Sequence, residues 1–294
     1  MDPLTVLVVR GGIVESRHRV HAVALRAGEV VEVAGDPGLV TFMRSSAKPL
    51  QAIPLARACE EIESEELAIA CASHLARPEQ LAAVERLLAL GGSSEEDLEC
   101  GFEGDPPSRL KHNCSGKHAG MLAVCRAHGW PHTGYVRPEH PIQRVLLAGV
   151  ARAADLREAQ IATGVDGCGV VSFALPLDRM ALAFARIAEL EGGAAVVAAM
   201  QAHPAFIRGP GAADTVLMGT LAGWIAKGGA EGLMCAAGPD GLGVALKIED
   251  GAGRAVRPAV AGFLRKLGYE LPQLELTSVE NSLGEQVGEI RLAP

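Results

Sequence analysis

The chain has 294 residues, of which 49% are hydrophobic, 21% are charged and 3% are aromatic, and its net charge is −8. A chain of this length and hydrophobicity can bury a large core, which excludes wholesale disorder. The negative charge and the scarcity of aromatic residues argue against a nucleic acid or an anionic membrane surface as partner.

The first residues do not resemble a targeting segment, because they lack a basic region and their apolar run is short. Longer apolar stretches are interrupted well before ~20 residues, so we expect no membrane span. The chain has seven cysteines. An odd number of cysteines without a secretion signal favours reduced thiols and a cytoplasmic protein.

Hydrophobic, β-branched runs predict strands at both ends of the chain. A turn signal at Arg26–Gly28 precedes the third run, and two later runs flank a second turn at Pro239–Gly241. The predicted strands are residues 4–9, 20–25, 29–35, 233–238, 243–248 and 285–293.

Apolar and alanine-rich segments predict helices between these strands, with Pro78 near one start and Gly91 past its end. The segment 161–177 is predicted as irregular strand and loop. The predicted helices lie within 49–91 and at 115–129, 141–155, 181–190, 194–203, 215–226 and 254–268.

This order predicts an α+β fold in which both chain ends form an antiparallel sheet around a mostly helical middle. Regular alternation of strands and helices is absent, which argues against a parallel sheet. We expect a single unit spanning 1–294, with a sheet-rich part at 1–45 plus 228–294 and a helix-rich part at 46–227.

Ser45 and Lys48 are three residues apart at a predicted helix start, so they share one face. A lysine with a lowered pKa can remove the proton of a serine nucleophile, and this spacing is used by penicillin-binding proteins and β-lactamases. The simpler interpretation is a helix-capping serine beside a solvated lysine, and the neighbouring Ser46 is an equally credible cap.

Cys114, Lys117 and His118 lie on one face of another predicted helix start, and Cys168 lies in a glycine-flanked loop. Two thiolates, one nitrogen and an open position are typical of a catalytic zinc site. From the spacing alone His118 is the preferred nitrogen ligand, while buried, metal-free cysteines remain an equal alternative.

Ser73 and Lys247 are further polar candidates in apolar surroundings. Ser73 lies between two predicted helices and is also explained as a residue that caps a helix end. Lys247 is also explained as a charged residue that an edge strand exposes to solvent. The chain has only six lysines against 21 arginines, which makes each lysine in a polar motif more informative.

Six short motifs occur in order along nearly the whole chain, from about residue 5 to residue 293. They are Glu15–His18, Arg44–Pro49, Ala72–His74, His112–His118, Asp166–Gly169 and Leu246–Ile248. The series resembles the rhizobial-type, or class 3, L-asparaginase family, and the His112–His118 and Asp166–Gly169 blocks are its most specific parts.

The resemblance implies a fold akin to serine β-lactamases and glutaminases, usually as a homodimer. It also implies hydrolysis of L-asparagine to L-aspartate and ammonia. The catalytic residues that it implies are two Ser–Lys pairs, Ser45 with Lys48 and Ser73 with Lys247.

The resemblance further implies a zinc site of Cys114, Lys117 and Cys168, in place of the His118 ligand preferred from spacing. His118 and Asp166 are then expected to contact the substrate or support the site from beside it.

Two other functions remain open at this point. One is a penicillin-recognising acyltransferase or β-lactamase-like enzyme, which would use the same Ser45 and Lys48. The other is a catalytically silent, zinc-binding regulatory protein on the same fold. The four intact serine and lysine residues argue against the second.

Overall fold

The computed structural model describes all 294 residues, and its largest element is an eight-stranded antiparallel sheet. The strand order is β10-β11-β1-β2-β9-β8-β7, and β3 pairs with the far end of β2. The chain thus joins its two ends in one sheet. The strands are β1 (Leu4–Arg10), β2 (Ile13–Arg26), β3 (Glu29–Ala34), β7 (Ile225–Gly229), β8 (Leu233–Gly238), β9 (Leu242–Ile248), β10 (Leu276–Glu280) and β11 (Gln286–Leu292).

A second, three-stranded antiparallel sheet lies where the large sheet meets the helical region. Its order is β4-β6-β5, formed by β4 (Val40–Phe42), β5 (Ala162–Val165) and β6 (Val171–Pro176). Val165 and Val171 pair at the end of β5 and β6, which makes residues 166–170 a tight connecting loop.

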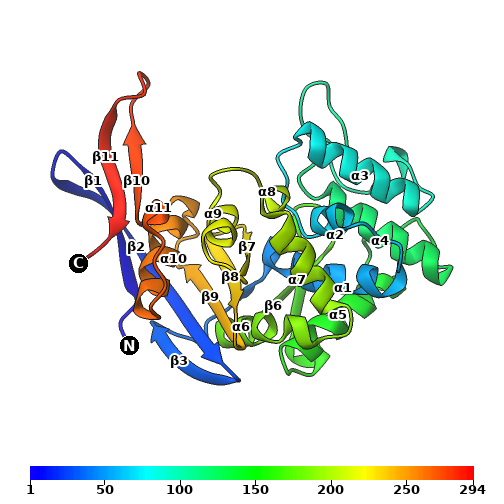
Figure 1. Cartoon of the computed structure of the whole chain (residues 1–294), viewed down its shortest axis with the longest axis horizontal. Coiled ribbons are helices and arrows are strands. Elements are labelled where there is room, and N and C mark those ends of the chain that lie inside the picture. The colour runs from blue at the N-terminus through cyan, green and yellow to red at the C-terminus, as the bar shows by residue number, and fades with distance from the viewer.

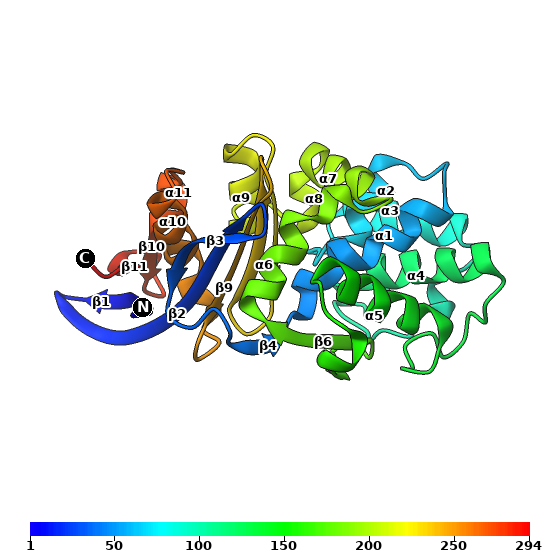
Figure 2. The ribbon, with the colours of Figure 1, turned by 90° about the horizontal axis from the view of Figure 1, so that it is seen from below.

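The helices form two groups, a bundle beside the large sheet and a few that cover its faces (Figures 1 and 2). The bundle contains α1 (Lys48–Ala58), α2 (Ser64–Ala70), α3 (Pro78–Leu90), α4 (Ser115–His128), α5 (Pro141–Ala153), α7 (Gly193–Ala202) and α8 (Pro204–Ile207). The others are α6 (Leu177–Ala185), α9 (Ala213–Thr220), α10 (Val256–Lys266) and α11 (Pro272–Glu275).

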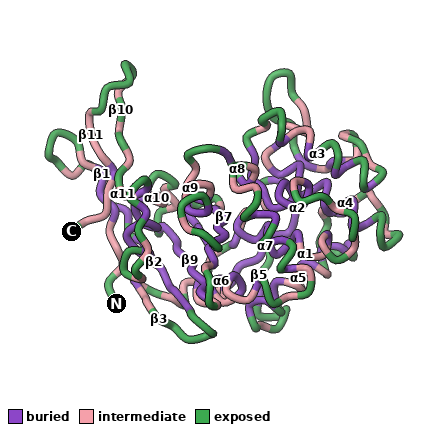
Figure 3. The backbone as a smooth tube through the Cα atoms, in the orientation of Figure 1, coloured by how far each residue is buried: buried purple, intermediate pink, exposed green.

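The large sheet is covered by helices on its two faces. Helix α6 packs on β2, β8 and β9, and α10 packs on β1, β8 and β11, so the two helices lie on opposite sides of the sheet (Figure 2). Buried residues run through the sheet and the bundle, and exposed ones gather at the tips of the hairpins (Figure 3). One continuous hydrophobic core joins the two parts.

Two glycines allow close approaches that bring distant segments together at this junction. A Cβ on Gly116 would lie 2.3 Å from the Ile69 carbonyl oxygen, so the start of α4 can press against the end of α2. A Cβ on Gly229 would lie 2.8 Å from the Met43 carbonyl oxygen, so β7 can lie directly beside the turn before α1. Side chains at these positions would push the segments apart.

The α+β fold with an antiparallel sheet from both chain ends is confirmed. The predicted helix over 215–226 is wrong in its second half, where α9 ends at Thr220 and β7 begins at Ile225. The strand β10 was missing from the prediction. None of the helices has the length and apolar character needed to cross a membrane.

Candidate active site

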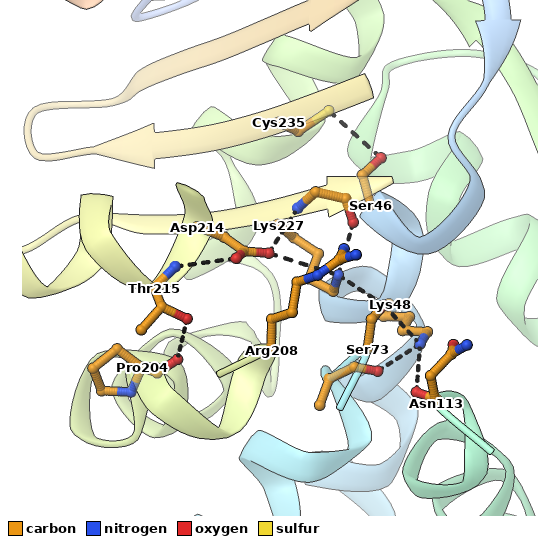
Figure 4. A network of polar contacts seen from close by, with 12 residues as sticks. Ser46, Lys48, Ser73, Asn113, Pro204, Arg208, Asp214, Thr215, Lys227 and Cys235 are labelled. Atoms are coloured by element: carbon orange, nitrogen blue, oxygen red, sulfur yellow. Dashed lines mark hydrogen bonds and ion pairs between the residues drawn. The ribbon is translucent and has the colours of Figure 1, made fainter. Parts of the chain in front are cut away.

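Ser73 lies between two buried lysine side chains, as Figure 4 shows. The Nζ atoms of Lys48 and Lys227 lie 3.1 Å and 3.0 Å from Ser73 Oγ. Both lysines are almost completely buried, with exposed fractions of 1% and 0%. A hydroxyl in contact with two amines can exchange a proton with either one, which is the arrangement that activates a serine.

The three residues come from separate elements. Lys48 begins α1, directly after the 3-10 turn η1 (Arg44–Ala47). Lys227 is the central residue of the edge strand β7. Ser73 follows α2, and its backbone N–H donates to the Ile207 carbonyl at 2.8 Å. The site therefore lies at the junction of the sheet and the bundle.

The surroundings of the two lysines differ. Lys48 also donates to the carbonyls of Ala72 and Asn113, so three acceptors are available to its ammonium group. Burial lowers the pKa of Lys48. Burial also lowers the pKa of Lys227, to about 7. A lysine with that pKa is partly neutral near neutral pH and can act as a base.

Asp214 of α9 is the nearest carboxylate to Lys227. Its Oδ2 atom lies 4.0 Å from Lys227 Nζ, and the side chain is 1% exposed. Backbone N–H groups of Thr215 and Gly228 donate to its two oxygens and hold it in place. Asp214 opposes the effect of burial, because its negative charge raises the pKa of Lys227.

Ser45 lines the same cavity as Ser73, and this cavity has a volume of about 850 Å³. Ser45 is half-buried in η1. The neighbouring Ser46 is buried, and its hydroxyl donates to the Met43 carbonyl at 2.7 Å. The two serines of this turn therefore differ in accessibility: a ligand in the cavity can reach Ser45 but not Ser46.

The predicted pairing of Ser73 with Lys247 is corrected by the structure. Lys247 lies near the end of β9, and its Nζ donates to the neighbouring Ile248 carbonyl. The strand β9 is internal, with β2 and β8 on either side, so Lys247 is not the edge-strand residue that was expected. Lys227 on β7 occupies the place beside Ser73.

Cys114, Lys117 and Cys168 come together as the resemblance implied. Lys117 Nζ lies 2.9 Å from Cys168 Sγ, and all three side chains are buried. A hydrogen bond from Cys168 holds the pKa of Cys114 well below its usual range, and the same bond raises the pKa of Cys168. Burial disfavours the Lys117 ammonium, but the two sulfur atoms raise its pKa above the ordinary value.

This group of donors fits a zinc ion. Sulfur and nitrogen are the ligands that zinc prefers, and three protein ligands leave a fourth position open. The observation that supports the fit is the contact of Lys117 Nζ with Cys168 Sγ, at 2.9 Å, in a buried space that also holds the Cys114 side chain. A zinc ion would replace the protons that now hold these three groups together.

His118 does not join this group. No three His, Cys, Asp or Glu side chains are close enough to hold a metal ion. His118 is fully buried in α4, and its Nδ1 atom lies 2.7 Å from the Tyr135 hydroxyl. Because His118 does not line the cavity of Ser45 and Ser73, its expected contact with substrate stays a prediction.

Asp166 is likewise absent from the cavity lining, and it forms an ion pair with Arg44 at 2.8 Å. Arg44 has a left-handed backbone conformation, with φ of 49°, which is uncommon outside glycine. The ion pair ties the loop that carries Cys168 to the residue directly before Ser45. Asp166 therefore supports the η1 turn in this structure.

Lys227 and Asp214 are the site residues that sequence reasoning missed. Lys227 directly followed the predicted helix 215–226 and was given no role, although it is one of only six lysines and precedes two glycines. Asp214 was likewise given no role. The rarity of lysine was the signal that could have identified Lys227.

The comparison with solved structures gave matches of low identity, among them the following three. The protein Mglu in its native form has a TM-score of 0.48 and 14% identity, and the match covers 86% of this chain and 66% of that one. A β-lactamase from Mycobacterium bovis has a TM-score of 0.37 and 15% identity over 78% of this chain and 86% of that one. The Bacillus subtilis glutaminase YbgJ, in covalent complex with 5-oxo-L-norleucine, has a TM-score of 0.38 and 12% identity over 86% of this chain and 89% of that one.

The comparison with curated protein sequences found no match. The comparison with family models gave a match over nearly the whole chain. This match spans both halves of the site, from the strands of the sheet to the cysteine motifs of the bundle. With a match to the L-asparaginase II model over residues 6–292, the chain belongs to that family of amidohydrolases.

Proposed function

We propose that the chain hydrolyses the side-chain amide of L-asparagine to L-aspartate and ammonia. The observation that carries this proposal is the Ser73 hydroxyl between the amines of Lys48 and Lys227, in a cavity that also exposes Ser45. Family membership supports amide hydrolysis, and the two lysines supply what a serine needs for that reaction.

In this reaction a serine oxygen attacks the amide carbon and forms an ester, and ammonia leaves with a proton returned by the enzyme. Water then cleaves the ester and releases the acid. Ser73 can exchange a proton with either lysine, as nucleophile or as proton carrier, since its oxygen contacts both amines directly. Lys227, with a pKa of about 7, is the base that can be neutral at neutral pH.

Both cavity serines are candidates for the residue that forms the ester, and a covalent inhibitor identifies which of them does. The enzyme is incubated with 5-diazo-4-oxo-L-norvaline, an asparagine-shaped diazoketone, and the modified peptide is identified by mass spectrometry. A label on Ser73 makes this residue the nucleophile. A label on Ser45 makes Ser73 the proton carrier between Ser45 and the lysines.

The function itself is tested by ammonia release from L-asparagine by the purified protein, with nitrocefin as the comparison. Ammonia release without nitrocefin turnover supports the proposal. Nitrocefin turnover alone favours the penicillin-recognising alternative. A protein that binds zinc and turns over neither substrate corresponds to the silent regulatory alternative.

We also propose that Cys114, Lys117 and Cys168 hold a zinc ion. Cys114 directly precedes α4, Lys117 lies in α4 and Cys168 lies in the loop 166–170, so the ion would tie these two segments together. When bound, zinc would supply a Lewis acid beside the cavity. A homodimer is proposed from the resemblance, and light scattering of the purified protein tests it.

A further inference from the structure

Arg208 is a cation of the cavity that has no partner of its own. It follows α8, is exposed and lines the same cavity as Ser45 and Ser73. Its guanidinium group makes no hydrogen bond and no ion pair within the protein. Figure 4 shows its side chain extending toward Lys227 and Asp214. An arginine facing a cavity without a partner can take an anionic ligand.

The backbone of this segment is fixed directly beside Ser73. The Ile207 carbonyl accepts the Ser73 N–H at 2.8 Å, so the residue before Arg208 is tied to the serine itself. The Arg208 carbonyl accepts from Gln80 Nε2 at 3.1 Å, and Gln80 is completely buried. The side chain therefore starts from a rigid position next to the reacting hydroxyl.

The other basic side chains of the cavity wall are engaged by the protein. Lys111 Nζ donates to the Pro106 carbonyl at 2.8 Å. Arg257 donates to the carbonyls of Gly211 and Gln273, which ties α10 to neighbouring segments. Arg208 is the basic group of this wall that remains available to a ligand.

We propose that Arg208 forms a carboxylate-binding subsite and binds the α-carboxylate of an amino-acid amide while the side-chain amide lies at the serines. This proposal rests on the proposed function. A guanidinium presents two parallel N–H donors that match the two oxygens of a carboxylate. The subsite would select free amino-acid amides over amides without an acidic group.

The geometry of asparagine suits this placement. Its amide carbon and its α-carboxylate carbon are separated by three single bonds, about 4 Å. Ser73 and Arg208 line the same cavity, whose volume of about 850 Å³ can hold a ligand of this size. The positive charge of Arg208 acts on the site. Together with burial, it lowers the pKa of Lys227.

The test compares L-asparagine with 3-aminopropanamide, which is asparagine without its α-carboxylate. Ammonia release is measured for the wild type, Arg208→Met and Arg208→Lys. We expect Arg208→Met to lower kcat/KM for asparagine by ~10–100-fold, mainly through KM, as loss of a charge-assisted hydrogen bond does. The same variant should change kcat/KM for 3-aminopropanamide by less than about threefold, and Arg208→Lys should restore part of the loss.

Lys111→Gln is the matched control, because it removes one positive charge from the same cavity wall. It should affect both amides by less than about threefold. An equal loss for both amides in Arg208→Met would assign Arg208 a structural role and overturn the proposal. No change for either amide would also overturn it.

A binding measurement separates this proposal from the proposed function. L-Aspartate, the expected product, is titrated calorimetrically into the wild type and Arg208→Met. If the wild type releases no ammonia from one or both amides, this titration alone decides whether Arg208 forms the carboxylate subsite. Binding weakened ~10-fold or more in the variant supports the subsite. Equal binding, or no binding by the wild type, overturns it.

Discussion

Lys227 Nζ lies 3.0 Å from Ser73 Oγ, although the two residues are 154 positions apart in the chain. This contact joins the edge strand β7 to the loop after α2. The hydroxyl is thereby placed at the junction of the large sheet and the helical bundle. Its proton exchange with Lys227 depends on the docking of these two parts, since the bundle supplies Ser73 and Lys48 while the sheet supplies Lys227.

The first prediction separates Lys227 from Lys247. Lys227→Met should lower kcat for ammonia release from asparagine by at least ~10²-fold, because it removes the base beside Ser73. Lys247→Met should change kcat by less than about threefold, because the Lys247 amine contacts only a neighbouring carbonyl. Steady-state kinetics on both variants, with circular dichroism to confirm folding, provides the measurement. A reversed order of the two effects would restore the pairing inferred from the sequence.

The failure to find Lys227 has a physical cause. The apolar run over 215–226 was predicted as one helix, although Gly223, with a φ of 81°, lies in the turn between Thr220 and Ile225. Because the strand begins inside this run, Lys227 appeared to follow a helix. The contact with Ser73 joins residues 154 positions apart, which is a long-range property that local patterns do not carry.

Local motifs predicted the rest of the site better. The grouping of Lys117 with Cys168 was implied by the resemblance that the His112–His118 and Asp166–Gly169 motifs carry, whereas the spacing alone preferred His118. The fold class followed from the order of strand and helix signals along the chain. The direction of His118 toward Tyr135 could not be predicted, because it depends on how the loop after α4 folds back over that helix.

The second prediction concerns pH. Lys227 must be neutral to accept a proton, so kcat/KM should rise with pH through about 7 in the wild type. Asp214 raises the pKa of Lys227, so Asp214→Asn should lower that pKa. The rising part of the profile should therefore move to lower pH. Ammonia release measured from pH 5 to 9 tests the direction, and a move to higher pH would exclude Lys227 as the titrating base.

The third prediction concerns the serines of the cavity. Ser73→Ala and Ser45→Ala should each lower kcat by at least ~10²-fold, since each removes a hydroxyl placed for nucleophilic attack or proton transfer. Ser46→Ala is the matched control, because its hydroxyl bonds the Met43 carbonyl and does not line the cavity. Near-wild-type turnover in both cavity variants would show that no Ser–Lys chemistry operates here.

The fourth prediction tests how Asp166 acts. If Asp166 works through Arg44, then Asp166→Ala and Arg44→Ala should lower kcat/KM by similar factors, and the double variant should lose little more than either. A direct substrate contact would instead give a higher KM in Asp166→Ala alone and additive losses in the double variant. The kinetic cycle on the four proteins distinguishes the two roles.

The fifth prediction concerns zinc, for which the spacing and the family resemblance gave different nitrogen ligands. The structure places the Lys117 amine 2.9 Å from Cys168 Sγ, while the His118 Nδ1 atom is engaged by Tyr135. We therefore expect about one zinc per chain in the wild type and a strong loss in Lys117→Ala, whereas His118→Ala should keep most of its metal. The sulfur atoms raise the pKa of Lys117, so the amine must give up a proton to bind zinc, and affinity should increase with pH. Metal content by mass spectrometry after dialysis at two pH values provides the measurement. Loss of zinc in the histidine variant alone would restore the imidazole ligand, and wild-type protein without zinc would leave the two cysteines as a buried hydrogen-bonded pair.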